Sequence, residues 1–476
     1  MANGCGCGRG RGSGCGYDCA VTETIDPFNG ESQVEAAWQA AEQSGPAGLT
    51  AGARRPSLWR HADYMKIWSA ASISQMGSQV SQFAIPYIAA VVLGAPPLQV
   101  ALLVTIEMLP FILFALPAGA WLDRVRRRPV LVAGDFGRAA ALITIPIAYA
   151  LGVLTIWQLY VVGFTTGLLT VLFDVADQSY LPALLDPDDL VEGNAKLQLP
   201  GAAAQIVGPG FAGELIGLIA APFTVVVDVI SFVLSGGLIA VVRKHEPKPV
   251  RRLAADGTQT SLRQEMAEGL RFVLGNRYLR MIAGSTATSN FGSSMAFSIY
   301  AVYVFVELGL TPALVGLASG LGAFGLVVGA FTAAPLARRF GVGPVIVGSI
   351  FVSGPALLLM VFLPRTPLVA GAMLLAGQLA MGFSAVVYNV NQVSFRQAIT
   401  PLDMQGRMNA TMRFIVWGTM PLGSVAGGIL ASFLPLRTTV LIGAVIASSA
   451  FLWVLVSPVR SLRVIPKGGR VEAATR

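Results

Sequence analysis

Charged side chains are scarce in this sequence. They make up 12% of its 476 residues, whereas a soluble globular domain carries about 25%. Hydrophobic residues reach 54%, and the mean hydropathy is +0.67. Because so few charges could not cover the surface of a water-soluble protein of this length, the composition predicts a membrane protein whose main partner is the lipid bilayer.

Other absences exclude whole classes of function. The only histidines are His61 and His245, no phosphate-cradling G-x-x-x-x-G-K-[ST] loop is present, and no soluble domain is left to house an enzyme. The net charge of +8 comes from short basic clusters without the interleaved aromatic residues of a nucleic-acid surface. We therefore expect no enzyme, no cofactor and no nucleic-acid partner.

Cysteine is confined to the first 19 residues, at Cys5, Cys7, Cys15 and Cys19, so no disulfide holds the rest of the chain. Residues 1–57 are also rich in glycine, and we predict a disordered extension. Four thiolates could bind zinc or copper(I), but C-x-C followed by C-x₃-C differs from the usual paired C-x₂-C spacing. A later translation start is a third interpretation, and we expect no metal.

Apolar runs long enough to cross a bilayer, about 20 residues each, occur twelve times. They lie at 66–93, 98–121, 130–150, 155–178, 198–220, 222–242, 278–306, 312–336, 342–363, 367–395, 411–433 and 437–457. The sequence therefore predicts an all-α membrane protein with twelve transmembrane helices. Six fall in residues 58–242 and six in residues 278–458, with a linker at 243–277 and a basic tail at 459–476.

Arginine and lysine are distributed unevenly between alternate loops. If the N-terminus is inside, the outer loops contain only Arg365 and Arg437, while the inner loops hold clusters such as 124–128 and 243–252. Positive charge resists translocation, so both termini are predicted to be cytoplasmic.

The linker changes character along its length. Residues 245–257 are charged and rich in proline, whereas Leu262, Met266, Leu270 and Val273 recur at helical spacing. The second pattern predicts either an amphipathic helix on the cytoplasmic surface or a plain linker helix.

The two halves repeat each other in sequence. Matching stretches are Tyr64-Met-Lys-Ile with Tyr278-Leu-Arg-Met, Pro97-Leu-Gln-Val-Ala-Leu with Pro312-Ala-Leu-Val-Gly-Leu, and Arg127-Arg128-Pro129-Val130 with Val342-Gly343-Pro344-Val345. Internal repeats are typical of transporters whose halves rock about a site near the bilayer midplane. We therefore expect two pseudo-symmetric six-helix bundles.

The loop between the second and third spans carries a signature. It reads Gly119-Ala-Trp-Leu-Asp123-Arg124-Val125-Arg126-Arg127-Arg128, and it resembles the G-x-x-x-D-R-x-G-R-R motif of the major facilitator superfamily. Arg126 stands where the family usually has glycine. The resemblance implies that Gly119, Asp123, Arg124, Arg127 and Arg128 form a gating motif; a merely positive-inside loop is the alternative.

The fifth span contains a second motif. Gly208-Pro209-Gly210-Phe211-Ala212-Gly213 resembles the G-P-x-x-G-G element of drug:proton antiporters, with Ala212 in place of one glycine. The resemblance assigns antiporter function to Gly208, Pro209 and Gly213. Glycine and proline also bend helices and allow close packing, so plain packing is the alternative.

Further stretches resemble the 12-span branch that contains macrolide-efflux proteins and the enterobactin exporter. They include Asp135-Phe-Gly-Arg138, Asp228-Val-Ile-Ser-Phe232 and Gly406-Arg407-Met-Asn409-Ala. The resemblance implies a monomeric, multi-pass protein of a bacterial plasma membrane that exports a small molecule (a drug, antibiotic or siderophore-like compound) in exchange for protons. A non-transporting sensor or assembly protein, and an importer or uniporter, are the alternatives.

Carboxylates inside the hydrocarbon are costly, so they are functional candidates by default. Glu107 falls near the midplane of the second span, where it could bind a proton, contact a cationic substrate or hydrogen-bond to a neighbouring helix. Glu214 follows the fifth-span motif, and Gly428 stands at the corresponding place in the other half. Glu107, Glu214 and Asp228 are the candidates for proton coupling, although a structural role is favoured for Asp228.

Other polar residues are candidates for gating and for contact with the substrate. Asp135 and Arg138 lie three residues apart and are expected to pair, and Asp174, Asp177 and Arg407 are further charge partners on the cytoplasmic side. The candidates for lining the cavity, each of which could instead form an interhelical hydrogen bond, are Gln75, Gln79, Gln82, Asn290, Gln378 and Asn389.

Overall fold

A computed structural model of the chain describes residues 58–122, 125–185, 189–243, 262–401 and 404–463. Within these ranges the chain is helical, and they contain no strand. This confirms the all-α class predicted from the composition. The predictions for the N-terminal extension, including the cysteines, and for most of the C-terminal tail fall outside the described residues.

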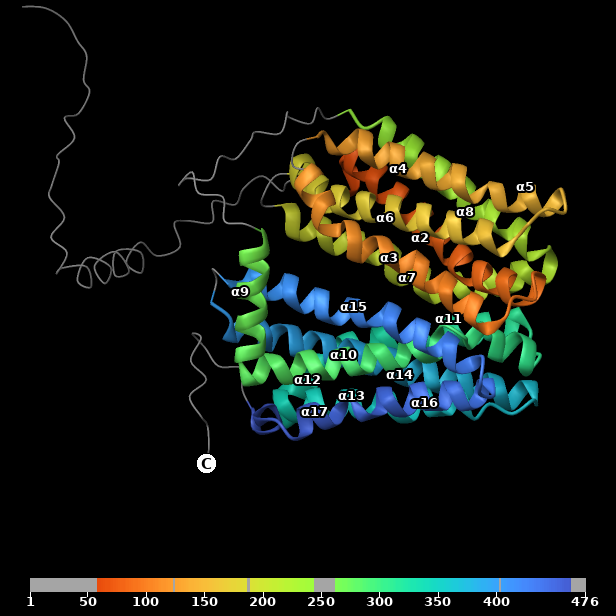
Figure 1. Ribbon diagram of the computed structural model, residues 1–476. Coiled ribbons are helices and arrows are strands. Elements are labelled where there is room, and N and C mark those ends of the chain that lie inside the picture. The colour runs from red at the N-terminus through yellow and green to blue at the C-terminus, as the bar shows by residue number, and fades with distance from the viewer. Residues whose placement is uncertain (1–57, 123–124, 186–188, 244–261, 402–403, 464–476) are drawn as a thin grey trace, which may run out of the picture. The chain divides into compact units, whose positions relative to one another are not determined.

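The first half of the body contains seven α-helices. They are α2 (Ala62–Tyr87), α3 (Pro97–Leu122), α4 (Arg127–Leu142), α5 (Thr144–Ala150), α6 (Ile156–Leu184), α7 (Leu190–Leu218) and α8 (Ala221–Ala240). A short 3₁₀-helix, η1 (Leu58–Arg60), precedes them. Figure 1 shows them as one group, coloured from red to lime.

The second half contains eight α-helices, coloured from green to blue in Figure 1. They are α10 (Arg277–Phe297), α11 (Pro312–Gly322), α12 (Phe324–Phe340), α13 (Val342–Val361), α14 (Pro367–Ile399), α15 (Gln405–Ala431), α16 (Leu436–Ser449) and α17 (Phe451–Leu455). A 3₁₀-helix, η6 (Pro458–Ser461), follows α17.

Nine helical segments within the described residues are long and apolar enough to cross a membrane. Three of these segments join two helices across a short break, namely α4 with α5, α11 with α12 and α16 with α17. The remaining long helices α2, α7 and α10 are more polar, with 26, 29 and 21 residues. Together, the segments are consistent with the twelve predicted spans. The largest differences are at three boundaries, where polar residues extend a helix beyond its apolar run, namely the starts of α7 and α15 and the end of α6.

The repeat predicted from the sequence extends to details of the backbone. The first span of each half ends in a π-helix, η2 (Ile88–Val92) in one and η4 (Val302–Glu307) in the other. Gly94, with φ 60°, and Gly309, with φ 66°, then turn the chain. Because a positive φ favours glycine, both halves need this residue at equivalent places.

Two pairs of helices hold the halves together. α7, the fifth span of the first half, packs against α11, which begins the second span of the second half. In the same way α15, the fifth span of the second half, packs against α3, the second span of the first half. Small residues make the first approach possible, since a Cβ at Gly213 would meet the Pro312 carbonyl oxygen and a Cβ at Gly316 would meet that of Pro209. Close backbone approach through small residues is typical of membrane helix pairs.

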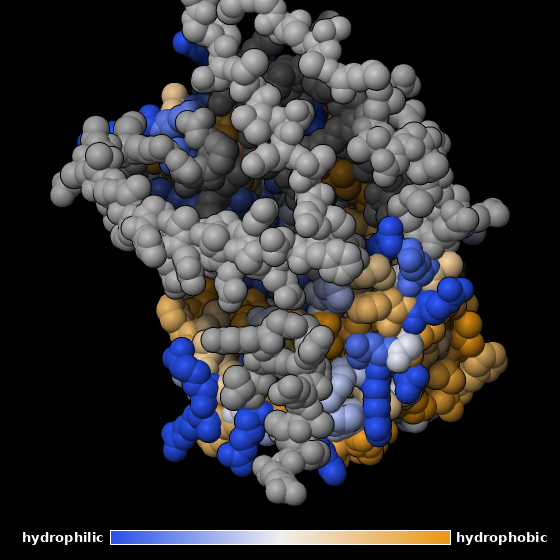
Figure 2. Space-filling view, turned by 90° about the vertical axis from the view of Figure 1, so that its left-hand side faces the viewer, coloured by the Kyte–Doolittle hydropathy of each residue, from blue (hydrophilic) through white to orange (hydrophobic). Residues whose placement is uncertain are grey.

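The helix predicted in the linker is confirmed as α9 (Leu262–Gly275). In Figure 1 it runs across the ends of the other helices, and it packs on α15 and α10. Val273 is fully buried, and Gly269 approaches the backbone of α15, whereas Leu270 is 43% exposed. Figure 2 looks at the end of the body that carries α9, where hydrophilic side chains gather in the visible part between hydrophobic flanks. This is the end that the arginine distribution predicts to be cytoplasmic.

Candidate transport site

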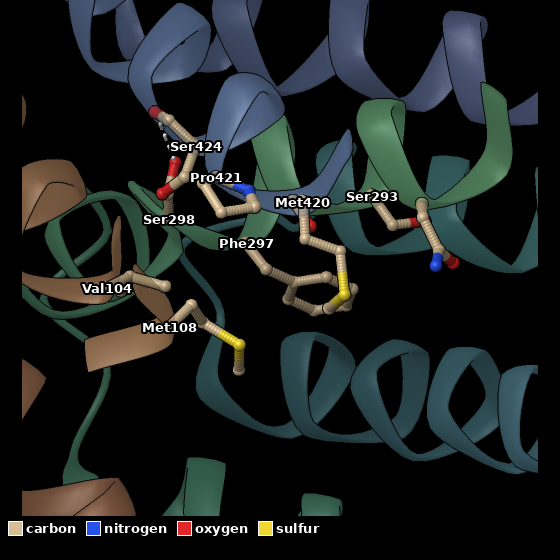
Figure 3. A pocket seen from close by; sticks show the side chains of 10 residues that line it. Val104, Met108, Ser293, Phe297, Ser298, Met420, Pro421 and Ser424 are labelled. Atoms are coloured by element: carbon tan, nitrogen blue, oxygen red, sulfur yellow. Dashed lines mark hydrogen bonds between the residues drawn. The ribbon is translucent and has the colours of Figure 1, made fainter. Parts of the chain in front are cut away.

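A cavity lies between the two halves. Its volume is about 210 Å³, and α3, α10 and α15 supply its walls (Figure 3). In Figure 3, Met108 extends from α3 into the same space as Phe297 and Met420. The full lining is Val104, Met108, Asn290, Ser293, Ser294, Phe297, Ser298, Met420, Pro421 and Ser424. A mostly apolar wall with a few polar groups suits a small organic molecule.

The two halves are in close contact at the end of the cavity that lies near the N-terminus of α3. The Ser424 hydroxyl donates a hydrogen bond to the Ala101 carbonyl oxygen across the halves at 3.0 Å. A Cβ at Gly428 would lie only 2.7 Å from the Ala101 Cβ. The rings of Phe83 in α2 and Phe305 in η4 also meet edge to face, with centroids 5.9 Å apart. This is the end predicted to face outward.

Glu107 lies on α3, one helical position before the cavity residue Met108. It is partly buried at the crossing of α3 and α6, where Gly163 and Gly167 leave room for it. A Cβ at Gly163 would lie 3.4 Å from the Glu107 Cγ. Within the described part of the chain, the Glu107 carboxyl has no hydrogen bond and no ion pair. It is therefore free to bind a proton or a ligand.

Asp135 and Arg138 form the ion pair that their spacing predicts, and both are buried. Asp135 also accepts a hydrogen bond from the Ser235 hydroxyl of α8 at 2.7 Å. The guanidinium of Arg138 lies over the rings of Phe173 and Phe232, 4.4 and 4.2 Å from their centroids. This packing ties α4 to α6 and α8, so the pair stabilises the first bundle from inside.

Asp228 belongs to the same buried region. It is 2% exposed, and the Ser231 hydroxyl donates to its carboxylate at 3.0 Å. A Cβ at Gly77 of α2 would lie 2.7 Å from the Asp228 Oδ1. Asp228 thus lies at a tight contact between α2 and α8, away from the cavity, which favours the structural role over proton coupling.

Glu214 lies apart from the cavity. It is exposed on α7, on the same helical face as Val207, Phe211 and Leu218, which are 54%, 45% and 74% exposed. Gly213, its neighbour, faces α11 instead. Glu214 is therefore not among the residues that line the cavity, and its part in proton coupling stays a prediction.

The gating motif is described only in part. Asp123 and Arg124 lie outside the described residues, and Gly119 lies within α3. The Arg128 guanidinium donates to the carbonyl oxygens of Ile239 and Ala240. It therefore caps the C-terminus of α8, a favourable place for a cation. Arg127, the next motif residue, is not without an interaction partner.

The remaining charge partners separate into two groups. Arg407 pairs with Glu268 of α9 at 2.7 Å, so it connects the linker helix to α15. Asp174 is exposed and Asp177 partly buried near the end of α6, and neither makes a hydrogen bond or an ion pair with another described residue. Their predicted pairing with the loop arginines stays a prediction.

The residues of the fifth-span motif pack against two different helices. Gly208 faces α2, where a Cβ would lie 2.7 Å from the Gln79 Cγ, and Gly213 faces α11. The Pro209 carbonyl oxygen lies against Gly316 of α11. The motif thus sets the contact between the halves, which is the packing role that its composition allows.

Of the six predicted cavity residues, Asn290 alone lines the cavity described above, and it also donates to the Val416 carbonyl oxygen at 3.1 Å. Gln75 and Gln79 lie at the contact of α2 with α7, and Gln378 donates to the Ser319 hydroxyl of α11 at 3.3 Å. Gln82 and Asn389 are exposed. Gln378 therefore forms the interhelical hydrogen bond that was the alternative, whereas Gln75 and Gln79 pack at an interface, and lining the cavity stays a prediction for them.

Sequence reasoning missed most of the lining. Val104, Met108, Phe297 and Met420 are apolar residues on membrane helices, and such residues carry no signal of a cavity. Val104 and Met108 on α3, and Met420 and Ser424 on α15, are each four residues apart, so helical periodicity could have placed each pair on one face of its helix. Only the pairing of α3 with α15 shows that these two faces meet.

Two pseudo-symmetric helical bundles with a cavity between them define a secondary transporter of the major facilitator type rather than an enzyme. The chain belongs to the transmembrane secretion effector family of this superfamily, whose model matches residues 56–467. This confirms the superfamily predicted from the loop motif.

Curated relatives and solved structures agree with this class. The chain is 23% identical over 371 residues to the MFS-type transporter YvqJ of Bacillus subtilis (strain 168), covering 76% of this chain and 84% of the relative. It is 24% identical over 346 residues to the multidrug efflux pump Tap of Mycolicibacterium fortuitum, covering 70% and 80%. Among solved structures, a bacterial homologue of the iron transporter ferroportin in its inward-facing state matches with a TM-score of 0.62 at 19% identity, covering 83% of this chain and 99% of that one. The nucleoside transporter NupG matches with a TM-score of 0.64 at 13% identity, with the same coverage. These structures show the fold.

Proposed function

We propose that the protein exports a small organic molecule from the bacterial cytoplasm across the plasma membrane, in exchange for protons. The observation that carries this proposal is the cavity of about 210 Å³ between the two halves, which meet firmly at one end of it. A binding site bounded by both halves is what alternating access requires. The similarity to a multidrug efflux pump supports the outward direction and a drug-like substrate.

The same contacts support an inward-facing conformation. The halves touch through Ser424, Gly428, Phe83 and Phe305 at the end that we take to be extracellular. With both termini in the cytoplasm, a substrate would enter the cavity from the other end. Rocking the halves about the cavity would then close that end and open the outer one.

Glu107 is the residue we propose for proton coupling. Its side chain lies at the crossing of α3 and α6, one position before the cavity residue Met108, and its carboxyl has no hydrogen bond or ion pair among the described residues. A carboxyl without a fixed partner can exchange its proton when the accessible side of the membrane changes. Glu214 lies on an outer face instead, so it serves as the matched control.

The experiment is proton release from energised inside-out vesicles, screened with hydrophobic, cationic and anionic compounds. Wild type and Glu214→Gln are expected to release protons on addition of a substrate, whereas Glu107→Gln is not. If Glu107→Gln responds like wild type, coupling lies elsewhere although export stands. If inserted wild type responds to no compound and moves no labelled compound in either direction, proton-coupled export is wrong.

A further inference from the structure

Beyond the cavity, α15 carries a positive charge on the face that it turns toward the first half. Ser424 and Met420 line the cavity, and Trp417 and Arg413 follow toward the N-terminal end of the helix. At about 100° per residue these positions fall on one face. Arg413 lies eight residues after the start of α15, roughly 12 Å along its axis. It is exposed.

Contacts with α3 fix the direction of this face. The Trp417 ring meets the Phe111 ring of α3 edge to face, with centroids 5.9 Å apart, and Ser424 bonds to Ala101 of the same helix. The guanidinium of Arg413 lies 5.3 Å from the centre of the Trp417 ring. Arg413 therefore stands where the halves part, on the far side of the aromatic pair from the closed end of the cavity.

Among the residues that the structure describes, Arg413 has no carboxylate partner. It forms no ion pair with another described residue, and the facing part of α3 after Phe111 contains no acidic residue. Within the second half, residues 277–460 hold ten arginines but only two acidic residues, Glu307 and Asp403, whereas residues 58–242 hold eight basic and twelve acidic residues. Of the other arginines of the second half, Arg365 and Arg437 lie in the outer loops, and the rest fit the positive-inside rule at helix ends. Arg413 is distinguished by facing the other half.

From this geometry, and resting on the proposed transport function, we infer that the substrate carries an anionic group on an aromatic or apolar body. Arg413 binds the anion at the cytoplasmic mouth, Trp417 and Phe111 contact the body as it passes, and the space between Met108, Phe297 and Met420 receives it. A guanidinium matches the geometry of carboxylate or sulfonate oxygens and can donate two parallel hydrogen bonds. Asn290 and the neighbouring serines offer the anion further donors deeper in the cavity.

A matched pair of ligands tests this inference without requiring turnover. Naphthalene-2-sulfonate and trimethyl(2-naphthyl)ammonium share one aromatic body small enough for the cavity but carry opposite, permanent charges. Binding is measured by equilibrium dialysis with purified full-length protein in lipid nanodiscs. Wild type is expected to bind the sulfonate more tightly than the ammonium ion. Arg413→Gln should weaken sulfonate binding roughly 10- to 100-fold, the loss of one charge-assisted hydrogen bond, and Arg413→Lys should keep much of it.

The control variant is Arg339→Gln. Arg339 is exposed at the end of α12 with its guanidinium 5.3 Å from the centre of the Phe340 ring, so it matches Arg413 in charge and aromatic contact but lies on another helix. Its removal should leave sulfonate binding unchanged. If wild type prefers the ammonium ion, or Arg413→Gln and Arg339→Gln weaken sulfonate binding equally, the inference is wrong. If only cationic compounds cause proton release, and this release depends on Glu107, the proposed export stands but the inference of an anionic substrate is wrong.

Discussion

At the scale of single residues, burial decides how much each charged pair stabilises this protein. The Asp135 and Arg138 side chains are 0% and 8% exposed, whereas those of Glu192 and Lys196 are 50% and 14% exposed. A buried ion that loses its partner keeps its full desolvation cost, but an exposed one is solvated by water. Removing one partner should therefore destabilise the protein more at the buried pair than at the exposed pair, although both pairs join residues one helical turn apart.

We predict that Asp135→Asn lowers the stability of the solubilised protein by about 3–5 kcal/mol, because the Arg138 charge is left buried without its carboxylate. Glu192→Gln should cost less than about 1 kcal/mol. Thermal unfolding in detergent measures both. A small effect of Asp135→Asn would mean that the two phenyl rings around Arg138 suffice to hold its charge.

Residue-scale predictions from the sequence succeeded where both partners lie on one helix. The spacing of Asp135 and Arg138 was sufficient to pair them. The contact of Arg128 with the end of α8 could not be predicted, since Ile239 lies 111 positions away in the chain. In a membrane protein, such long-range contacts leave little trace in composition or periodicity.

At the scale of elements, the fifth-span motif packs closely on α11. Gly213 and Gly210 belong to the same motif, yet their surroundings differ. A Cβ at Gly213 would collide with the Pro312 backbone, whereas the nearest atoms to one at Gly210 are 3.9 Å away. The motif could be identified from sequence, but which of its glycines needs to be glycine depends on where α11 lies.

Gly213→Ala is expected to impair transport, since overpacking at a helix contact costs about 1–3 kcal/mol. Gly210→Ala should transport like wild type. Initial rates in vesicles, corrected for the amount of inserted protein, make the comparison. Equal losses in both variants would indicate that the motif acts through backbone flexibility.

The linker helix allows a second prediction at this scale. A Cβ at Gly269 would lie 2.5 Å from the Thr411 hydroxyl oxygen and 3.0 Å from the Arg407 carbonyl oxygen, whereas Gly275 has open space around it. Gly269→Ala should loosen α9 from α15 and accelerate tryptic cleavage at Arg271, and Gly275→Ala should not. Unchanged cleavage in Gly269→Ala would mean that the Glu268 and Arg407 ion pair alone holds α9.

At the scale of the whole molecule, the sequence was sufficient for the architecture. Hydropathy located the spans, and the repeats predicted two related halves, which the π-helices η2 and η4 and the paired turns at Gly94 and Gly309 confirm. The cavity could not be located in the same way. Its walls come from α3 in one half and from α10 and α15 in the other, and no local pattern records that pairing.

The proposed inward-facing conformation can be tested by locking it. In a background with the four native cysteines replaced by serine, Ala101→Cys with Gly428→Cys should crosslink readily without substrate, because a Cβ at Gly428 would lie beside the Ala101 Cβ. The crosslink should abolish transport, and a reductant should restore it. Each single variant is the control. Undiminished transport by crosslinked protein would show that this end need not open.

The closure between the halves has a consequence for the protein's response to salt. Among the described residues the two halves share one hydrogen bond, from Ser424 to Ala101, and no ion pair; the rest of the contact is apolar and close-packed. Dissolved salt screens the interactions between charges, but it does not weaken close apolar packing. The stability of the conformation described above should therefore not depend on ionic strength. An opposite conformation, closed by ion pairs of the loop arginines with Asp174 or Asp177, would be destabilised by high salt. Raising the salt concentration should drive the population toward the state described above.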